Sequence, residues 1–199
     1  MNNMDHILQS GAELDTRSDE SKLKDFKQEE LVAGGGEAVN WVEKLADKIR
    51  KFPIFNQNGS GSCVAQTQSK EMGIMRQLKD GNYVHFSATD IFQRRANKPK
   101  SGMGAIDARK IAQEGVTLED LAPSQHLSDK EMDNAVVEPY KREVGKVFAV
   151  PNYVTLTTGS IDEVASLIQH TGKGVMLWFY FTNDEWGNAP TVQYPNLKV

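Results

Sequence analysis

Apolar side chains recur at helical spacing in four segments of the chain after residue 60. Capping and stop residues accompany them: Ser87 and Ser160 stand before two of these segments as predicted N-caps, and Gly115 closes a third. Ser160 is followed three residues later by Glu163, which is the spacing of a capping box. The pattern therefore predicts helices over residues 63–78, 88–95, 105–114 and 160–170.

Two other segments have the composition of strands. Residues 147–156 are rich in β-branched and aromatic side chains, and residues 175–181 form a short, strongly apolar run. Most of the predicted helices come early in the chain, and the predicted strands come late. This order indicates the α+β fold class, with a helical half followed by a sheet half.

The first quarter of the chain differs from the rest in its charge. Residues 1–50 hold 11 acidic and 7 basic side chains, a difference that equals the whole net charge of −4. Residues 1–36 are polar and have few apolar clusters, so we expect an acidic, flexible arm that does not fold alone and is available to a protein partner. Residues 37–51 repeat apolar positions at helical spacing and predict a short helix within a main domain of residues 37–199.

Composition argues against several classes of protein. The longest apolar run, residues 174–181, is far shorter than the ~20 residues of a membrane span. The N-terminus lacks the basic start and apolar stretch of a secretory signal, which favours a cytoplasmic or virion-associated protein. The net charge of −4 argues against binding to nucleic acids or anionic membranes.

Cys63 is the one cysteine of the chain, so an intrachain disulfide is impossible, and neither a metal nor a cofactor is expected. It follows the small residues 59–62 and begins a predicted helix, whose first backbone N–H groups favour a thiolate. The Cys63 N–H and the Gln57 amide would together form an oxyanion hole for a substrate carbonyl. The alternative interpretation is a buried, small apolar side chain, the usual role of a lone cysteine.

Residues 52–65 resemble the segment around the active-site cysteine of papain-like cysteine peptidases; they read Phe-Pro-Ile-Phe-Asn-Gln-Asn-Gly-Ser-Gly-Ser-Cys-Val-Ala. By this resemblance Cys63 corresponds to the nucleophile and Gln57 to the oxyanion-hole glutamine. Gly102-Met103-Gly104 is similar to the family's glycine-bearing substrate loop, and the likeness runs to the end of the chain. The resemblance implies a two-part fold, with a helical half followed by an antiparallel sheet half. It also implies a peptide or protein substrate, whose peptide bonds are hydrolysed through an acyl-enzyme.

Two departures from the family's pattern matter. Ser60 stands where the family has a disulfide cysteine, which fits a reducing compartment or a virion. The family's histidine lies about 130–150 residues after the cysteine, and residues 193–199 contain none. We interpret the four histidines present as surface or capping residues: His6, His85, His126 and His170. We therefore expect a truncated sheet half, no general base within this chain, and an inactive chain when it is alone.

Two functions follow from these observations. The first is a papain-like cysteine endopeptidase in which Cys63 is the nucleophile. The second is a catalytically silent papain-like structural or binding module, for example of a phage particle. Retention of Cys63 and Gln57 favours the first, and the missing histidine favours the second. Two charged stretches, residues 94–100 and 129–131, are interpreted as solvent-exposed, the second as a turn or helix start.

Overall fold

The computed structural model describes residues 15–26, 30, 52–156 and 160–177. Three predictions fall outside these residues: the helix over 37–51, the end of the apolar run over 178–181, and most of the arm. The described residues form the helices α2 (Asp19–Lys22), α5 (Cys63–Asp80), α6 (Ala88–Gln93), α7 (Ala105–Glu114), α8 (Asp129–Asn134), α9 (Pro139–Lys146) and α10 (Ile161–Thr171). None of the helices in this part of the chain is long and apolar enough to cross a membrane.

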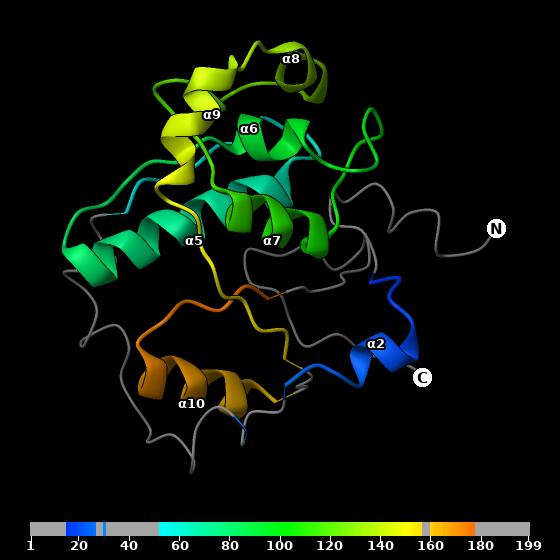
Figure 1. Ribbon diagram of the computed structural model, residues 1–199, viewed down its shortest axis with the longest axis vertical. Helices are drawn as coiled ribbons and strands as arrows, with labels where there is room; N and C mark the ends of the chain where they lie inside the picture. Colours follow the sequence, from blue (N-terminus) through cyan, green and yellow to red (C-terminus); the bar gives the residue numbers. More distant parts are fainter. Residues whose placement is uncertain (1–14, 27–29, 31–51, 157–159, 178–199) are drawn as a thin grey trace, which may run out of the picture.

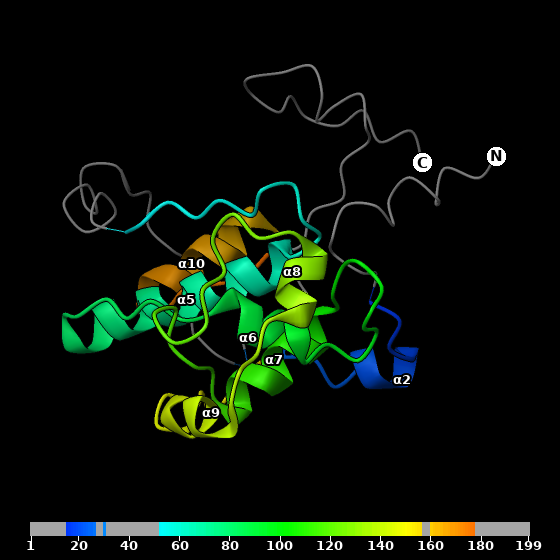
Figure 2. The same cartoon turned by 90° about the horizontal axis from the view of Figure 1, so that it is seen from above.

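Helix α5 lies at the centre of the helical part, and α6 and α7 pack against it (Figures 1 and 2). Helix α8 packs on α6, and α10 lies on the other side of α5 from α8 and α9 (Figure 1). The core includes the buried side chains of Phe86, Ile91, Phe92 and Met103. Their removal from water is the main term that holds the helices together.

The four helices predicted from apolar spacing are confirmed as α5, α6, α7 and α10. Ser87 and Ser160 are N-caps, as predicted, because each hydroxyl accepts the backbone N–H three residues further on, at 3.0 and 3.4 Å. Gly81 ends α5 in the left-handed conformation, with a φ of +77°. Local capping signals therefore set these boundaries.

Helices α8 and α9 are not predicted from apolar spacing, because both are short and mostly polar. Helix α8 instead begins with a capping box, in which Ser128 and Glu131 each accept the other's backbone N–H. Helix α9 begins with Pro139, which suits the first turn because no helical bond needs its missing N–H. The signals for both helices are present in the sequence, but they are capping signals rather than periodic ones.

The strand predicted over residues 147–156 is not formed. Residues 149–155 have no regular secondary structure, and Leu156 makes one isolated bridge, to Phe26. Residues 175–177, the described start of the second predicted strand, are also irregular. A strand needs a neighbouring strand to accept and donate its backbone hydrogen bonds. Within the described ranges only isolated β-bridges occur. This part of the molecule is mainly helical and without a sheet, so the sheet half remains a prediction.

A buried ion pair places α8 against α6. The Arg95 side chain is fully buried, lies 3.7 Å from the centroid of the Phe92 ring, and donates to both oxygens of Asp133 at 2.6 and 2.8 Å. It also donates to the Phe92 and Lys100 carbonyls. The predicted solvent exposure of residues 94–100 is therefore wrong for Arg95, because its planar, multi-donor guanidinium is fully satisfied inside the protein.

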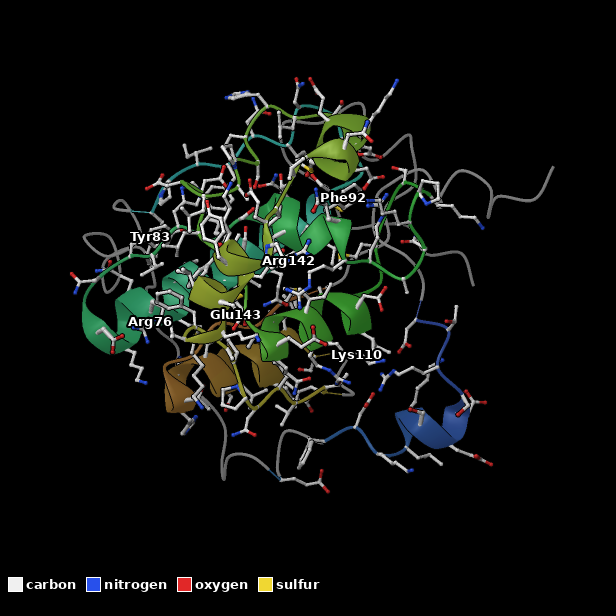
Figure 3. All side chains as sticks on the ribbon, turned by 45° about the horizontal axis from the view of Figure 1, so that its top comes forward. Arg76, Tyr83, Phe92, Lys110, Arg142 and Glu143 are labelled. Carbon is white, nitrogen blue, oxygen red and sulfur yellow. The ribbon has the colours of Figure 1, made fainter. Side chains whose placement is uncertain are left out.

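A second ion pair places α9 against α6. Asp90 has a fully buried carboxylate, which accepts the Arg142 Nε–H at 3.0 Å and the Thr117 N–H at 3.1 Å. The Arg142 side chain extends from α9 (Figure 3). The Arg94 Nη1 lies 3.5 Å from the other Asp90 oxygen, so the buried carboxylate has two cationic partners. The two pairs together fix α8 and α9 on α6.

The described part of the N-terminal arm contacts the main domain. It contains the one-turn helix α2, capped by Ser18. The Phe26 N–H donates to the Thr155 carbonyl at 2.9 Å, and Arg17 forms an ion pair with Asp25 at 2.6 Å. The Phe26 bond connects residues 15–26 to the segment before α10, and the ion pair holds the arm segment itself together.

Candidate active site

A tight turn over residues 57–60 precedes Cys63. The Ser60 N–H donates to the Gln57 carbonyl at 2.9 Å, and the two residues between them, Asn58 and Gly59, have positive φ of +51° and +71°. This is the pattern of a type I′ turn, for which Asn-Gly is a favoured pair. The turn leads the chain into α5.

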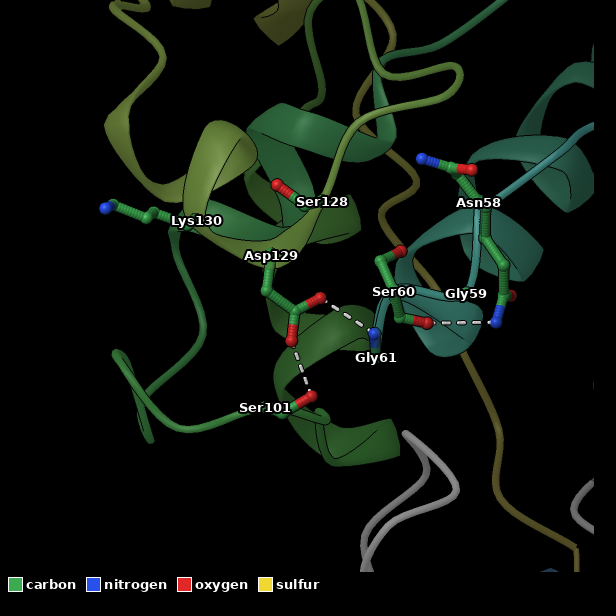
Figure 4. A pocket seen from close by; sticks show the side chains of 9 residues that line it. Asn58, Gly59, Ser60, Gly61, Ser101, Ser128, Asp129 and Lys130 are labelled. Atoms are coloured by element: carbon green, nitrogen blue, oxygen red, sulfur yellow. Dashed lines mark hydrogen bonds between the residues drawn. The ribbon is translucent and has the colours of Figure 1, made fainter.

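Two side chains from distant parts of the sequence hold this turn. Asp129 of α8 accepts the Gly61 N–H at 2.7 Å and the Ser101 hydroxyl at 2.5 Å (Figure 4). From another segment, the Gln125 Oε1 accepts the Asn56 N–H at 2.8 Å. The predicted helix start at Asp129 is confirmed, and the residue is half-buried, with both carboxylate oxygens bonded to protein groups.

Cys63 is the first residue of α5, as predicted. Its N-cap, Ser62, makes no side-chain capping bond, and the Ser62 hydroxyl instead bonds the Ser60 hydroxyl at 2.6 Å. Burial raises the pKa of the Cys63 thiol above its ordinary value, and hydrogen bonds from the Val64 and Cys63 backbone N–H groups offset this only in part. The half-buried sulfur packs against the apolar core, which is why the helix start does not by itself favour the thiolate here.

Gln57 lies on the turn with its amide held in place. The Nε2 atom donates to the Ser60 carbonyl at 3.0 Å, and the residue is half-buried. A primary amide has two N–H donors, and the second one bonds no other described residue. The Gln57 amide is thus ordered by the turn while one donor stays available.

The predicted substrate loop, residues 102–104, lies against the same turn. A Cβ built on Gly61 would lie 2.0 Å from the Ser101 Oγ and 2.8 Å from the Gly102 nitrogen, so this approach requires glycine at position 61. Met103 is fully buried in the core, and Gly104 is the N-cap of α7. Within residues 102–104, only the backbone is placed to face a ligand.

The histidines lie at different places around the fold. His85 is half-buried and stacks on a phenylalanine ring, with 4.6 Å between centroids. His126 is exposed; its backbone N–H donates to the Asn56 carbonyl, and its carbonyl accepts the Asn58 side-chain amide. The His170 Nδ1 lies 2.8 Å from a carbonyl of its own helix, α10. His6 is outside the described residues, and these contacts do not assign a general base.

A polar pocket of about 510 Å³ opens beside the turn (Figure 4). Its walls are residues 57–61, Ser101 and the first turn of α8 with Ser128, Asp129 and Lys130. Among the described residues, no group of three histidine, cysteine, aspartate or glutamate side chains is arranged to hold a metal ion. The wall of the pocket consists mainly of polar side chains and glycines.

Comparison with known proteins identifies the fold. No family model and no curated protein sequence matches the chain. Xylellain, a cysteine protease from Xylella fastidiosa, matches with a TM-score of 0.54 at 15% identity, over 80% of this chain and 63% of its own. A structure from work on the mite allergens Blo t 1 and Der p 1 matches with a TM-score of 0.54 at 15% identity, over 85% of this chain and 54% of that one.

The chain thus has a fold similar to that of papain-like cysteine proteases, and it spans less than two thirds of the length of the structures it matches. This confirms the predicted resemblance at the level of the fold. A shared fold at 15% identity does not establish activity or the roles of residues. The matched proteins come from Xylella fastidiosa and from mites, so a phage or virion origin stays a prediction.

Sequence analysis missed the side chains that support the turn. Asp129 and Gln125 bond residues 68 and 69 positions away, and no local pattern marks such partners. Buried Glu119 accepts the Ser124 N–H and hydroxyl and the Gln125 N–H, and so holds the segment that carries Gln125. A local signal exists only for Asp129, because the capping box that begins at the preceding residue predicts a helix start there.

Proposed function

We propose that this chain carries the nucleophile of a papain-like cysteine peptidase, with Cys63 as the nucleophile and Gln57 as an oxyanion-hole donor. The observation that supports this most is the position of Cys63 as the first residue of α5, directly after a tight turn that holds the Gln57 amide. The similarity of the fold to papain-like cysteine proteases adds to it.

The proposed reaction is acyl transfer. The Cys63 thiolate attacks the scissile carbonyl carbon, so that a C–S bond forms and the carbonyl electrons move onto oxygen. The N–H groups of Cys63 and Gln57 donate to this oxyanion. The C–N bond then breaks, a general acid protonates the leaving amine, and water hydrolyses the thioester.

The reaction also requires a group that activates the thiol. Burial raises the pKa of the Cys63 thiol, whereas a peptidase nucleophile needs its pKa lowered by a neighbouring cation, commonly a protonated histidine. His85 stacks on a ring and the His170 ring contacts its own helix. We therefore infer that the general base is a histidine other than these two and other than exposed His126.

One observation favours the second function, a catalytically silent module. A half-buried thiol with a raised pKa that packs against the core is what a structural cysteine shows. In such a module, the pocket and the loops around it bind a protein partner without chemistry. The predicted partner of the N-terminal arm and the phage particle belong to this alternative.

The experiment that separates the two functions is a peptidase assay of the 199-residue chain with and without added imidazole, a small base that can take the place of a histidine side chain. We expect imidazole to raise the hydrolysis of a peptide substrate by the unmodified chain and to leave Cys63→Ala inactive. Thr67→Ala, at an exposed position of the same helix, is the matched control and should keep the activity. A chain that leaves all peptides intact in imidazole, with an unmodified thiol, would support the silent module.

A further inference from the structure

We propose that the pocket beside the turn selects a basic side chain, lysine or arginine, in the substrate residue next to the scissile bond, and that Asp129 determines this specificity. The inference rests on the proposed function, because it takes Cys63 as the point of attack. It goes beyond that function by naming the substrate class.

The pocket lies close to Cys63. Its wall includes Gly61, which stands two residues before Cys63, and two residues of extended chain span at most about 7 Å. A substrate carbonyl at the Cys63 sulfur is therefore near the pocket. The long side chain of a lysine or arginine beside that carbonyl is suited to enter a polar volume of about 510 Å³.

Asp129 gives the pocket wall a negative charge that the protein itself does not neutralise. Its two oxygens accept hydrogen bonds from neutral donors, the Gly61 N–H and the Ser101 hydroxyl. In the described part of the chain, no lysine or arginine nitrogen lies within the 4.0 Å of an ion pair with it. Each carboxylate oxygen has two lone pairs, so each can accept another hydrogen bond from a cationic ligand.

Lys130 is the other charged residue of the wall, and it does not reverse this preference. Its side chain points away from the Asp129 carboxylate (Figure 4), and the residue is exposed. Water and salt screen a mobile, exposed ammonium group. The Asp129 carboxylate is held by two short hydrogen bonds, so its charge is fixed at the wall and dominates the selection of a ligand.

The test compares two peptide chloromethyl ketones that differ only in one side chain, arginine in the first and the neutral analogue citrulline in the second. In both reactions the Cys63 sulfur forms a bond to the methylene carbon and chloride leaves. For the 199-residue chain, we expect the arginine reagent to alkylate Cys63 about tenfold faster, the effect of one charge-assisted hydrogen bond. Intact mass spectrometry measures both rates, and Cys63→Ala identifies the labelled residue.

Asp129→Asn should bring the ratio of the two rates close to one. Asparagine keeps an oxygen for the Gly61 N–H and an amide that can bond the Ser101 hydroxyl, so the turn is retained while the charge is removed. Asp120→Asn, which removes the charge of an exposed aspartate outside the pocket wall, is the matched control and should keep the tenfold ratio. The rate with iodoacetamide, measured for every variant, reports any general change in thiol reactivity.

Several results would overturn the inference. A ratio near one in the unmodified chain, or a ratio that Asp129→Asn leaves unchanged, would contradict the proposed specificity of Asp129. Neither result would contradict Cys63 as the nucleophile. A preference for a glutamate over a glutamine reagent would assign the pocket to Lys130 and an acidic substrate. If neither ketone labels Cys63 while iodoacetamide does, the proposed function itself fails, and the inference fails with it.

Discussion

At Cys63, two influences on the thiol oppose each other. Burial against the core raises its pKa, and the hydrogen bonds from the backbone N–H groups of Val64 and Cys63 lower it to a smaller extent. The balance means that the folded chain holds its thiol proton at a pH where an exposed cysteine has begun to lose it. The same balance would shift if an imidazolium approached the sulfur.

The pH dependence of alkylation tests this balance. The rate of Cys63 with iodoacetamide should rise with pH around a midpoint above that of a short unfolded cysteine peptide, because only the thiolate reacts. The raised pKa also means that the thiol contributes stability below the ordinary cysteine pKa, which is lost as pH rises through the folded pKa. A midpoint below that of the reference peptide would show instead that Cys63 is already activated.

At Gly61, the space around the Cα atom excludes any side chain larger than hydrogen. Gly61→Ala should lower the free energy of unfolding by about 1–3 kcal/mol, because its Cβ would meet the Gly102 nitrogen at 2.8 Å and the backbone would have to move. Urea denaturation measures this change. Gly174→Ala is the control, since its Cβ would meet only Glu71, at an ordinary 3.6 Å. Equal effects of the two variants would contradict the close packing of the turn.

At the scale of elements, the start of α8 connects helix capping to the site. Ser128→Ala should cost about 1 kcal/mol, because the capping box loses the hydroxyl that accepts the Glu131 N–H. It should also weaken the hold of the neighbouring Asp129 on the Gly61 N–H, which hydrogen exchange at Gly61 would detect. Ser128→Thr keeps the hydroxyl and should preserve both properties, and a loss equal to that of alanine would argue against the cap.

Helix α5 carries a second titrating group, Glu71. Burial raises its pKa above the ordinary 4.5, and the hydrogen bond from Gln68 lowers it by less. The folded state therefore holds more protons than the unfolded state, and stability falls as pH rises from about 4.5 through the raised folded pKa. Glu71→Gln should remove this fall and make the protein more stable at neutral pH than the unmodified chain.

Urea denaturation from acidic to neutral pH measures the effect of Glu71→Gln. The control is Glu138→Gln, because the hydrogen bond from Lys141 lowers the pKa of Glu138. Its carboxylate adds stability above the ordinary pKa, and that stability is lost as pH falls, so this control should change the pH dependence in the opposite direction. A Glu71→Gln variant with an unchanged pH profile would contradict the assignment.

The sequence predicts those elements whose signals are local. The apolar spacing of residues 63–78 and the stop at Gly81 predict helix α5. Ser160, with Glu163 three residues later, predicts the start of α10. The strand predicted over residues 147–156 fails because strand formation depends on a partner that no local pattern specifies. The helix start at Cys63 was predictable from local signals, whereas Asp129 bonds Gly61 across 68 residues.

At the scale of the whole molecule, the described chain presents the helical part of a fold similar to that of papain-like cysteine proteases. The buried pairs Arg95–Asp133 and Asp90–Arg142 fix α8 and α9 on α6, and α8 in turn holds the turn before Cys63 through Asp129. The scaffold thus orders the segment that carries Cys63. The acid–base partner that would complete a catalytic site is part of the proposal.

The most direct test of the central claim, that Cys63 is an acyl-transfer nucleophile, is to treat the 199-residue chain with the p-nitrophenyl ester of a short peptide. Nitrophenolate leaves without a general acid, so the sulfur can form a thioester even without a histidine. We expect one acyl group on Cys63 by intact mass and peptide mapping, none in Cys63→Ala, and about 100-fold slower acylation in Gln57→Ala. An unacylated Cys63 that still reacts with iodoacetamide, or an equal adduct in Cys63→Ala, would contradict the claim.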